Sequence, residues 1–305
     1  MPRVFYGPYD ERNQDYANSG HANLGRFPLG HILILPDNRQ YRFALNDGTV
    51  EIAGNLYQSV AGVANHTNVA CDVARAIDAT VISATLGATA AAIDIYSEGT
   101  VHTNDAVGEG YTYAITRALA AGGAHAAVAS SGIITVNLAA GEMVQVALTT
   151  ASEVSFTRNR YHAVLIHGSP PTARVAGVSP GVAAADRFYW SQTKGYAAVL
   201  ASGTLLEGLP VMAGITTDGS VEGLKRRARS GGTTVLLPTT AALTGLRMVD
   251  QDGVTTDFMT VASVSTAATA NYDITGPIAV NAPAIGMTVK ANATTEQALI
   301  DLNID

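Results

Sequence analysis

A serine in the pattern G-x-S-x-G is the first candidate for chemistry. Residues 177–181 read GVSPG, with Ser179 in the nucleophile position. In hydrolases with this pattern, the backbone N–H of the residue after the serine helps to stabilise the oxyanion. Here that residue is Pro180, which has no N–H. The motif also lies in a Pro- and Gly-rich stretch, so we expect no nucleophile at this serine.

A second serine motif is S-x-x-K, formed by Ser191 and Lys194. The partner motifs SDN and KTG of penicillin-binding enzymes are absent from the chain. The aromatic run beside it predicts a strand, in which residues i and i+3 point to opposite faces. The serine and the lysine are therefore expected not to meet.

Acidic residues, histidines and the cysteine are the remaining candidates for catalysis or metal binding. Asp94, Glu98, Asp105 and Glu109 lie near glycines, and two such carboxylates could serve a glycosidase or a calcium loop. No D-x-D-x-D-G loop is present, which favours solvated turn residues. The seven histidines form no HExxH motif, and Cys71 is the single cysteine, so zinc has no support. The sequence thus predicts no catalytic, cofactor-binding or metal-ligating residue.

The composition indicates a component of an assembly. Only 14% of the 305 residues are charged, against about 25% in ordinary soluble domains. The mean hydropathy is +0.17, although no stretch approaches the ~20 apolar residues of a spanning helix. A surface with so few charges is expected to be covered by other protein. The net charge of −7 argues against direct nucleic-acid binding, and we expect no membrane partner.

Residues 1–27 are polar and rich in Gly and Asn, with no helical or strand period. A disordered tail and an extended arm that docks on a neighbour both fit this pattern. Disordered segments are usually poor in aromatic residues, and this segment contains several. Its candidate partner contacts are Phe5, Tyr6, Tyr9 and Tyr16.

One basic run stands out in the acidic chain. It consists of Lys225, Arg226, Arg227 and Arg229. An exposed loop and an electrostatic contact with an acidic partner surface are both open readings. Nucleic acid ranks third, because so small a patch opposes a negative net charge.

Short alternating segments separated by Gly, Asn and Asp turns predict an all-β fold of β-sandwich or β-barrel modules. An Asp-Gly pair at residues 47–48 predicts a hairpin, while residues 69–77 have helical spacing. The last segment could be capped as a helix, but its period of two favours a strand. The predicted strands include residues 32–35, 41–45, 50–52, 80–86, 100–103, 111–115, 133–138, 143–148, 153–157, 162–166, 188–190, 197–200, 285–289 and 298–304.

The expected domain organisation follows composition. An N-terminal arm (1–27) precedes a β-rich sandwich or barrel (28–167), and a Pro- and Gly-rich linker (168–181) follows it. A second β-barrel-like module (182–305) contains a Thr/Ala/Ser-rich insertion at about 224–277.

The amino-acid sequence resembles those of structural proteins encoded among the head genes of tailed bacteriophages. The resemblance is carried by FPLG (27–30), YRFA (41–44), AGNLYQS (53–59), TLGATA (85–90), GEGYTY (108–113), VALTTASEV (146–154), YWSQT (189–193) and PAIGM (283–287) through LNI (302–304). The C-terminal stretch is similar to the last strands of capsid cement modules. Residues 224–277 depart from the pattern.

The resemblance implies a non-enzymatic decoration or cement protein that is made in the host cytoplasm. Such proteins place β-barrels over lattice points on the capsid exterior, often as homotrimers that bind the major capsid protein. No cofactor is implied. Two other functions remain open: a fibre or turret protein that binds a receptor or glycan through Trp190 and the tyrosines near Gly110, and a depolymerase that uses Glu98 and Glu109.

Overall fold

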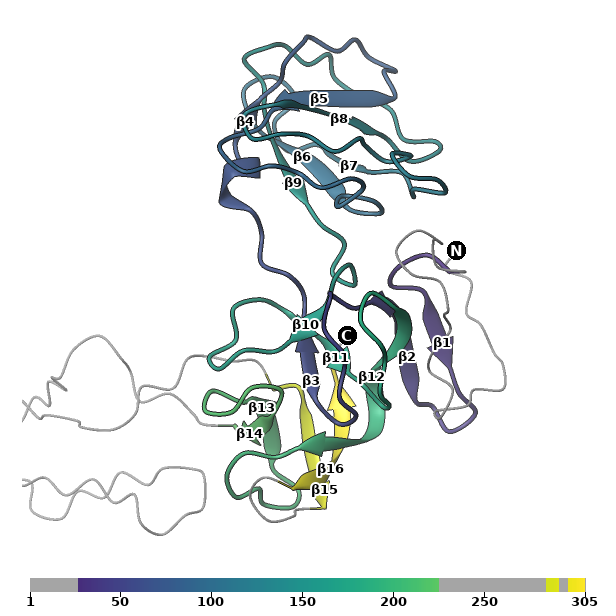
Figure 1. Cartoon of the computed structure of the whole chain (residues 1–305), viewed down its shortest axis with the longest axis vertical. Helices are drawn as coiled ribbons and strands as arrows, with labels where there is room; N and C mark the ends of the chain where they lie inside the picture. Colours follow the sequence, from purple (N-terminus) through teal and green to yellow (C-terminus); the bar gives the residue numbers. More distant parts are fainter. Residues whose placement is uncertain (1–26, 225–283, 291–295, 305) are drawn as a thin grey trace, which may run out of the picture.

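The computed structural model describes residues 27–224, 284–290 and 296–304, and within them the chain is all-β, as predicted (Figure 1). The helical structure in these ranges is a 3-10 turn, η2 (Ala64–His66). Most strands are short, and the strands pair antiparallel within three sheets. No helix in the described ranges is long and apolar enough to cross a membrane.

The largest sheet has ten strands and collects segments from both ends of the chain. Its main path runs β10-β3-β11-β12-β16-β15-β13-β14, and β2 pairs with both β1 and β12. The strands are β1 (Ile32–Ile34), β2 (Gln40–Leu45), β3 (Leu56–Gln58), β10 (Leu165–Ile166), β11 (Val175–Val178), β12 (Phe188–Leu200), β13 (Pro210–Ala213), β14 (Val221–Gly223), β15 (Gly286–Lys290) and β16 (Gln297–Asn303).

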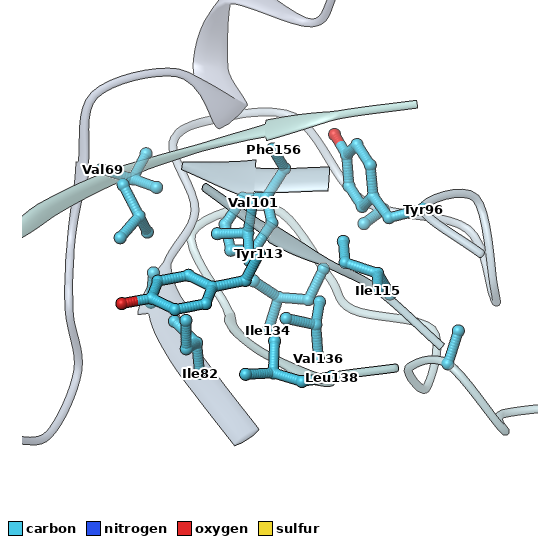
Figure 2. Close-up of a cluster of buried hydrophobic side chains, with 14 of the residues drawn as sticks. Val69, Ile82, Tyr96, Val101, Tyr113, Ile115, Ile134, Val136, Leu138 and Phe156 are labelled. Carbon is cyan, nitrogen blue, oxygen red and sulfur yellow. The ribbon is translucent and has the colours of Figure 1, made fainter. Parts of the chain in front are cut away.

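Two smaller sheets are inserted between β3 and β10 and form the upper part of Figure 1. One has the order β4-β9-β6-β7, and the other pairs β5 with β8. Their strands are β4 (Val69–Ala70), β5 (Val81–Thr85), β6 (Thr100–Asp105), β7 (Thr112–Ala114), β8 (Ile133–Asn137) and β9 (Glu153–Thr157). The two sheets share one hydrophobic core, which Figure 2 shows.

Period-two alternation accounts for the best-predicted strands. In β8, Ile134 and Val136 are buried while the residues between and beside them are exposed. In β16, Ala298, Ile300 and Leu302 are buried on one face in the same way. The strand prediction for the last segment is confirmed, and the helical alternative is wrong, because every second side chain faces the core.

The hairpin predicted at residues 47–48 does not form. The chain turns there, and the Asp47 carboxylate accepts the Thr49 N–H at 2.9 Å. However, Asn46 bridges to Val164 and Glu51 bridges to Ala183, so the two limbs pair with other segments. The Asp-Gly pair fixed a turn but could not fix the partners. The helical spacing at residues 69–77 was also misleading, since this stretch holds β4 and irregular backbone.

The strands do not pair according to the predicted boundary at residues 168–181. β11 lies inside the predicted linker, and β2 and β3 pair with β12 and β11. Gly177 allows this pairing, because a Cβ there would lie 2.8 Å from the Gln192 carbonyl oxygen. The segments predicted at 188–190 and 197–200 are one strand, β12. The predicted arm and most of the predicted insertion lie outside the described residues.

An aromatic cluster fills the core where β2 meets β12. Phe43 stacks on Phe188 with centroids 5.2 Å apart, and it meets Trp190 edge-on at 5.1 Å. Phe27 packs against Trp190 at 5.4 Å and stacks on His31 at 5.3 Å. The beginning of the described chain is therefore held by the large sheet.

The small sheets are tied to this same point. The Arg117 guanidinium donates to the Phe27 carbonyl at 3.0 Å, and a Glu98 carboxylate oxygen accepts the Leu29 N–H at 2.9 Å. Arg117 and Glu98 also form an ion pair at 3.5 Å. In addition, the Asn159 side-chain amide donates to the Glu98 carbonyl at 3.0 Å. These contacts fix residues 27–29 between the large sheet and the inserted sheets.

A buried histidine–tyrosine–histidine network stabilises the inserted sheets. One His125 ring nitrogen faces the Ala126 carbonyl at 2.8 Å, and the other accepts the Tyr96 N–H at 3.2 Å. His66 contacts the Tyr96 hydroxyl and the Thr89 carbonyl in the same manner. The His125 ring thus uses one nitrogen as acceptor and the other as donor, which requires the neutral imidazole.

We expect the network to make stability depend on pH. Burial lowers the pKa of His125 below its ordinary value of 6.5, although the Ala126 carbonyl and Asp94 oppose this. The unfolded chain then binds more protons than the folded chain, so the free energy of unfolding falls as the pH drops below 6.5. One histidine contributes at most about 1.4 kcal/mol per pH unit.

Thermal melting of the wild type and of His125→Gln between pH 7.5 and pH 5 measures this contribution. His31 and His167 also have lowered pKa values, so the variant should keep part of the slope. An identical slope in both proteins would contradict the assignment to His125.

Candidate interaction surface

Both serine motifs lie inside the protein. Ser179 is fully buried, and its hydroxyl donates to the Gly181 carbonyl at 2.7 Å. Ser191 is also buried, whereas Lys194 on the same strand is exposed. The prediction that Ser191 and Lys194 point apart is confirmed. Neither hydroxyl can reach a substrate in solution.

The acidic residues near glycines have structural partners. The Asp94 carboxylate accepts the N–H groups of Gly122, Ala124 and His125 at 2.6, 2.9 and 3.1 Å. Glu98 is engaged at residues 27–29, as described above. The prediction of solvated turn residues is wrong for Asp94, which is buried beneath a loop. No group of three or more His, Cys, Asp or Glu side chains within the described ranges could hold a metal.

The predicted contact residues lie outside the part of the chain that the structure describes. They are Phe5, Tyr6, Tyr9 and Tyr16 in the N-terminal segment, and Lys225, Arg226, Arg227 and Arg229 in the basic run. The basic run begins directly after Leu224, which is hydrogen-bonded to Pro210 at the edge of β13. Interaction surfaces must therefore be sought on the described strands.

The outer side of β12, β16 and β15 carries several exposed apolar side chains. Tyr196 is 57% exposed and Met287 is 50% exposed. Both lie opposite Asp301 of the central strand, so they flank it on one face. Leu299 lies two residues away on the same face. We call this surface the outer apolar face, and it consists of Tyr196, Met287, Val289 and Leu299, with Asp301 between Tyr196 and Met287.

Strand alternation forces these side chains outward. The opposite face of the same strands packs a core that includes Ala197, Val199, Ile300 and Leu302. The intervening positions must then point to solvent or to a partner. Exposed apolar patches on a protein commonly mark contacts with another macromolecule.

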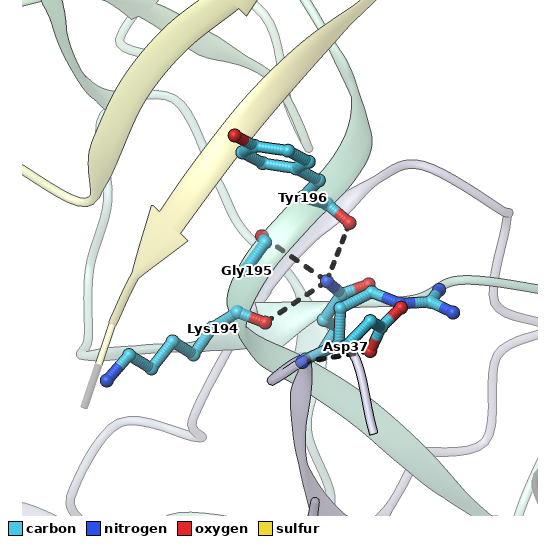
Figure 3. A network of polar contacts seen from close by, with 6 residues as sticks. Asp37, Lys194, Gly195 and Tyr196 are labelled. Atoms are coloured by element: carbon cyan, nitrogen blue, oxygen red, sulfur yellow. Dashed lines mark hydrogen bonds and ion pairs between the residues drawn. The ribbon is translucent and has the colours of Figure 1, made fainter. Parts of the chain in front are cut away.

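The face has few charges and a fixed backbone. The three strands carry only Lys194, Lys290 and Asp301 as charged residues. The Gln192 side-chain amide donates to the carbonyls of Lys194, Gly195 and Tyr196 at 3.2, 3.3 and 2.9 Å (Figure 3). This interaction fixes the backbone where β12 changes partner, which is the backbone that carries Tyr196.

Sequence reasoning missed the outer apolar face. The available signal was alternation around Tyr196 and Met287, in which apolar residues occupy both strand faces. Such a pattern normally indicates a strand that is buried on both sides. Trp190, in contrast, is only 1% exposed, so the expectation that it forms an exposed platform is wrong.

We predict that the face contributes little to folding. The double variant Tyr196→Thr/Met287→Thr should change the free energy of unfolding by within about 0.5 kcal/mol per site, because both side chains are exposed. Ile300→Thr, on the buried side of the neighbouring strand, should cost about 2–4 kcal/mol. Chemical denaturation measures both values. A double variant as unstable as Ile300→Thr would show that the face is part of the core.

Comparison with known proteins does not assign the chain to a family. No family model, no curated protein and no solved structure matches it. Its function must therefore be inferred from composition, fold and surface chemistry.

Proposed function

We propose that the chain is a non-enzymatic structural protein of a virion, a capsid decoration or cement protein that binds the coat-protein shell of a tailed phage. The observation that carries this proposal is the outer apolar face on a chain with only 14% charged residues. Such a surface is suited to lasting contact with another protein. The sequence resemblance to phage head proteins supplies the kind of partner.

The mechanism is burial of apolar area across neighbouring coat subunits. Each Å² of apolar surface removed from water contributes about 25 cal/mol, but association costs offset much of this gain. A specific stable interface buries roughly 1,200–2,000 Å² in total. Repeated sites on a shell let several copies or contacts act together, so modest single contacts suffice. The homotrimer implied by the resemblance would provide this multivalency.

Several side-chain environments support binding over catalysis. Ser179 and Ser191 are buried, and Asp94 and Glu98 hold backbone N–H groups. These residues complete the packing of the fold. The alternative of a glycan-binding fibre or turret protein has weaker support, because Trp190 and Tyr113 are each 1% exposed and Tyr111 alone of the three offers an accessible ring.

We predict that the outer apolar face is needed for shell binding. Purified Tyr196→Thr/Met287→Thr should bind capsids that lack the native protein at least about tenfold more weakly, which is roughly 1.4 kcal/mol. Tyr111→Thr removes an exposed tyrosine from the inserted sheets and serves as a matched control that keeps wild-type affinity. Co-sedimentation with capsids measures both. Equal binding by the double variant and the wild type would sink the proposed role of this face.

The N-terminal segment is the second predicted contact. Deleting residues 1–26 should weaken attachment to capsids while leaving the melting temperature unchanged. The deletion must stop before Phe27, because this ring packs against Trp190. Decoration by the truncated protein as complete as that by the intact chain would show that the segment does not contribute.

A further inference from the structure

The free edge of β1 has the features of a strand-pairing site. β1 lies at the end of the branch β12-β2-β1, and no described strand pairs with its other side. Leu33 is buried against the aromatic cluster, while Ile32 and Ile34 are half-buried. The edge therefore combines a firmly anchored strand with backbone groups that no described strand pairs.

The pattern of hydrogen bonds between β1 and β2 shows which backbone groups of β1 point away from β2. Leu33 faces Tyr41 in the register of β1 and β2, and the Leu35 N–H donates to the Arg39 carbonyl at 3.0 Å. In an antiparallel pair, alternate residues direct both backbone groups at the partner strand. The N–H and C=O groups of Ile32 and Ile34 consequently point away from β2.

This edge is short but carries no charged side chain. Edge strands are commonly blocked by short length, charged residues, prolines or bulges, and β1 has three residues and lies between Pro28 and Pro36. Residues 28–35 read PLGHILIL and contain no Asp, Glu, Lys or Arg. The nearest charges are already used, since Arg39 bonds Asp37 at 2.6 Å and Arg42 donates to the Gly30 carbonyl at 3.0 Å.

We propose that β1 pairs antiparallel with β1 of a second copy of this chain, about a two-fold axis at Leu33. This register places Ile32 opposite Ile34 of the second copy, and both residues have outward backbone groups. Each of the two Ile32–Ile34 pairs then exchanges both N–H···O bonds, as antiparallel geometry requires. The outward N–H and C=O groups of one β1 therefore match those of the second β1, and neither β1 strand contains a charged residue.

The contact stands apart from the proposed function. It does not require a shell, and its two-fold symmetry gives a dimer rather than the trimer that the resemblance implies. A three-residue strand buries far less than a stable interface, so we expect a dissociation constant on the order of 0.1 mM. On a lattice, the same contact would link neighbouring copies at high local concentration.

Sedimentation equilibrium of the full chain, from about 10 µM to about 1 mM, tests the pairing. We expect a monomer–dimer equilibrium that Ile34→Pro weakens at least tenfold. Proline removes the outward N–H but leaves the pairing of Leu33 with Tyr41 intact. Ile34→Val keeps the N–H and is the matched control with wild-type dimerisation. Melting temperatures establish that both variants are folded.

Amide hydrogen exchange gives a second readout in the unmodified protein. With a dissociation constant of about 0.1 mM, the Ile32 and Ile34 amides should exchange about fourfold more slowly at about 1 mM than at about 10 µM. The Leu33 amide, which faces β2, should be protected equally at both concentrations.

Four outcomes would overturn the proposal. They are a monomer at every concentration, a trimer or dimer unaffected by Ile34→Pro, protection of Ile32 and Ile34 that is independent of concentration, and loss of the dimer on deleting residues 1–26. The last outcome would assign self-association to the N-terminal segment rather than to β1.

Discussion

The fold depends on the backbone pairing of one long strand, β12. Its first half pairs with β2 from Phe188 to Lys194, and its second half pairs with β16 from Lys194 to Leu200. β11 joins it at Gln192. Gly195, with φ of +81°, sits at the change of partner, where a Cβ would lie 3.2 Å from the Arg39 backbone. Segments from the beginning, middle and end of the chain are thereby held in one sheet.

This constraint also explains the surface. Because β12 and β16 direct Val199, Ile300 and Leu302 into the core, the alternate positions have no core left to enter. In an ordinary soluble domain these positions would carry charges. Here Tyr196 and Met287 take two of them, on either side of Asp301. Composition alone predicts a partner, and the sheet register shows which apolar side chains the proposed contact would use.

The sequence allowed prediction where one face of a strand decides burial. Residues 153–157 were predicted as a strand and form β9 with the same bounds, because Val154 and Phe156 alternate with more polar residues. The sequence pattern did not predict which strands pair when they are far apart in the chain. Asp47 and Gly48 specify a turn whatever the limbs pair with, and the glycines and prolines around β11 concealed a strand. The outer apolar face escaped notice because hydrophobicity on both strand faces also describes a buried strand.

The three proposed contacts, which involve the N-terminal segment, the edge of β1 and the outer apolar face, are all connected to β12. Phe27, which follows the N-terminal segment, packs against Trp190 of this strand, and Arg117 and Glu98 hold its neighbourhood. Burial raises the pKa of Glu98, whereas the Leu29 N–H and Arg117 favour the charged carboxylate, so this anchor is a balance of desolvation and pairing. β1 reaches β12 through β2, and Tyr196 belongs to β12 itself. Contacts built on one rigid strand keep fixed spacings, and fixed spacing is what lets weak contacts reinforce one another on a regular lattice.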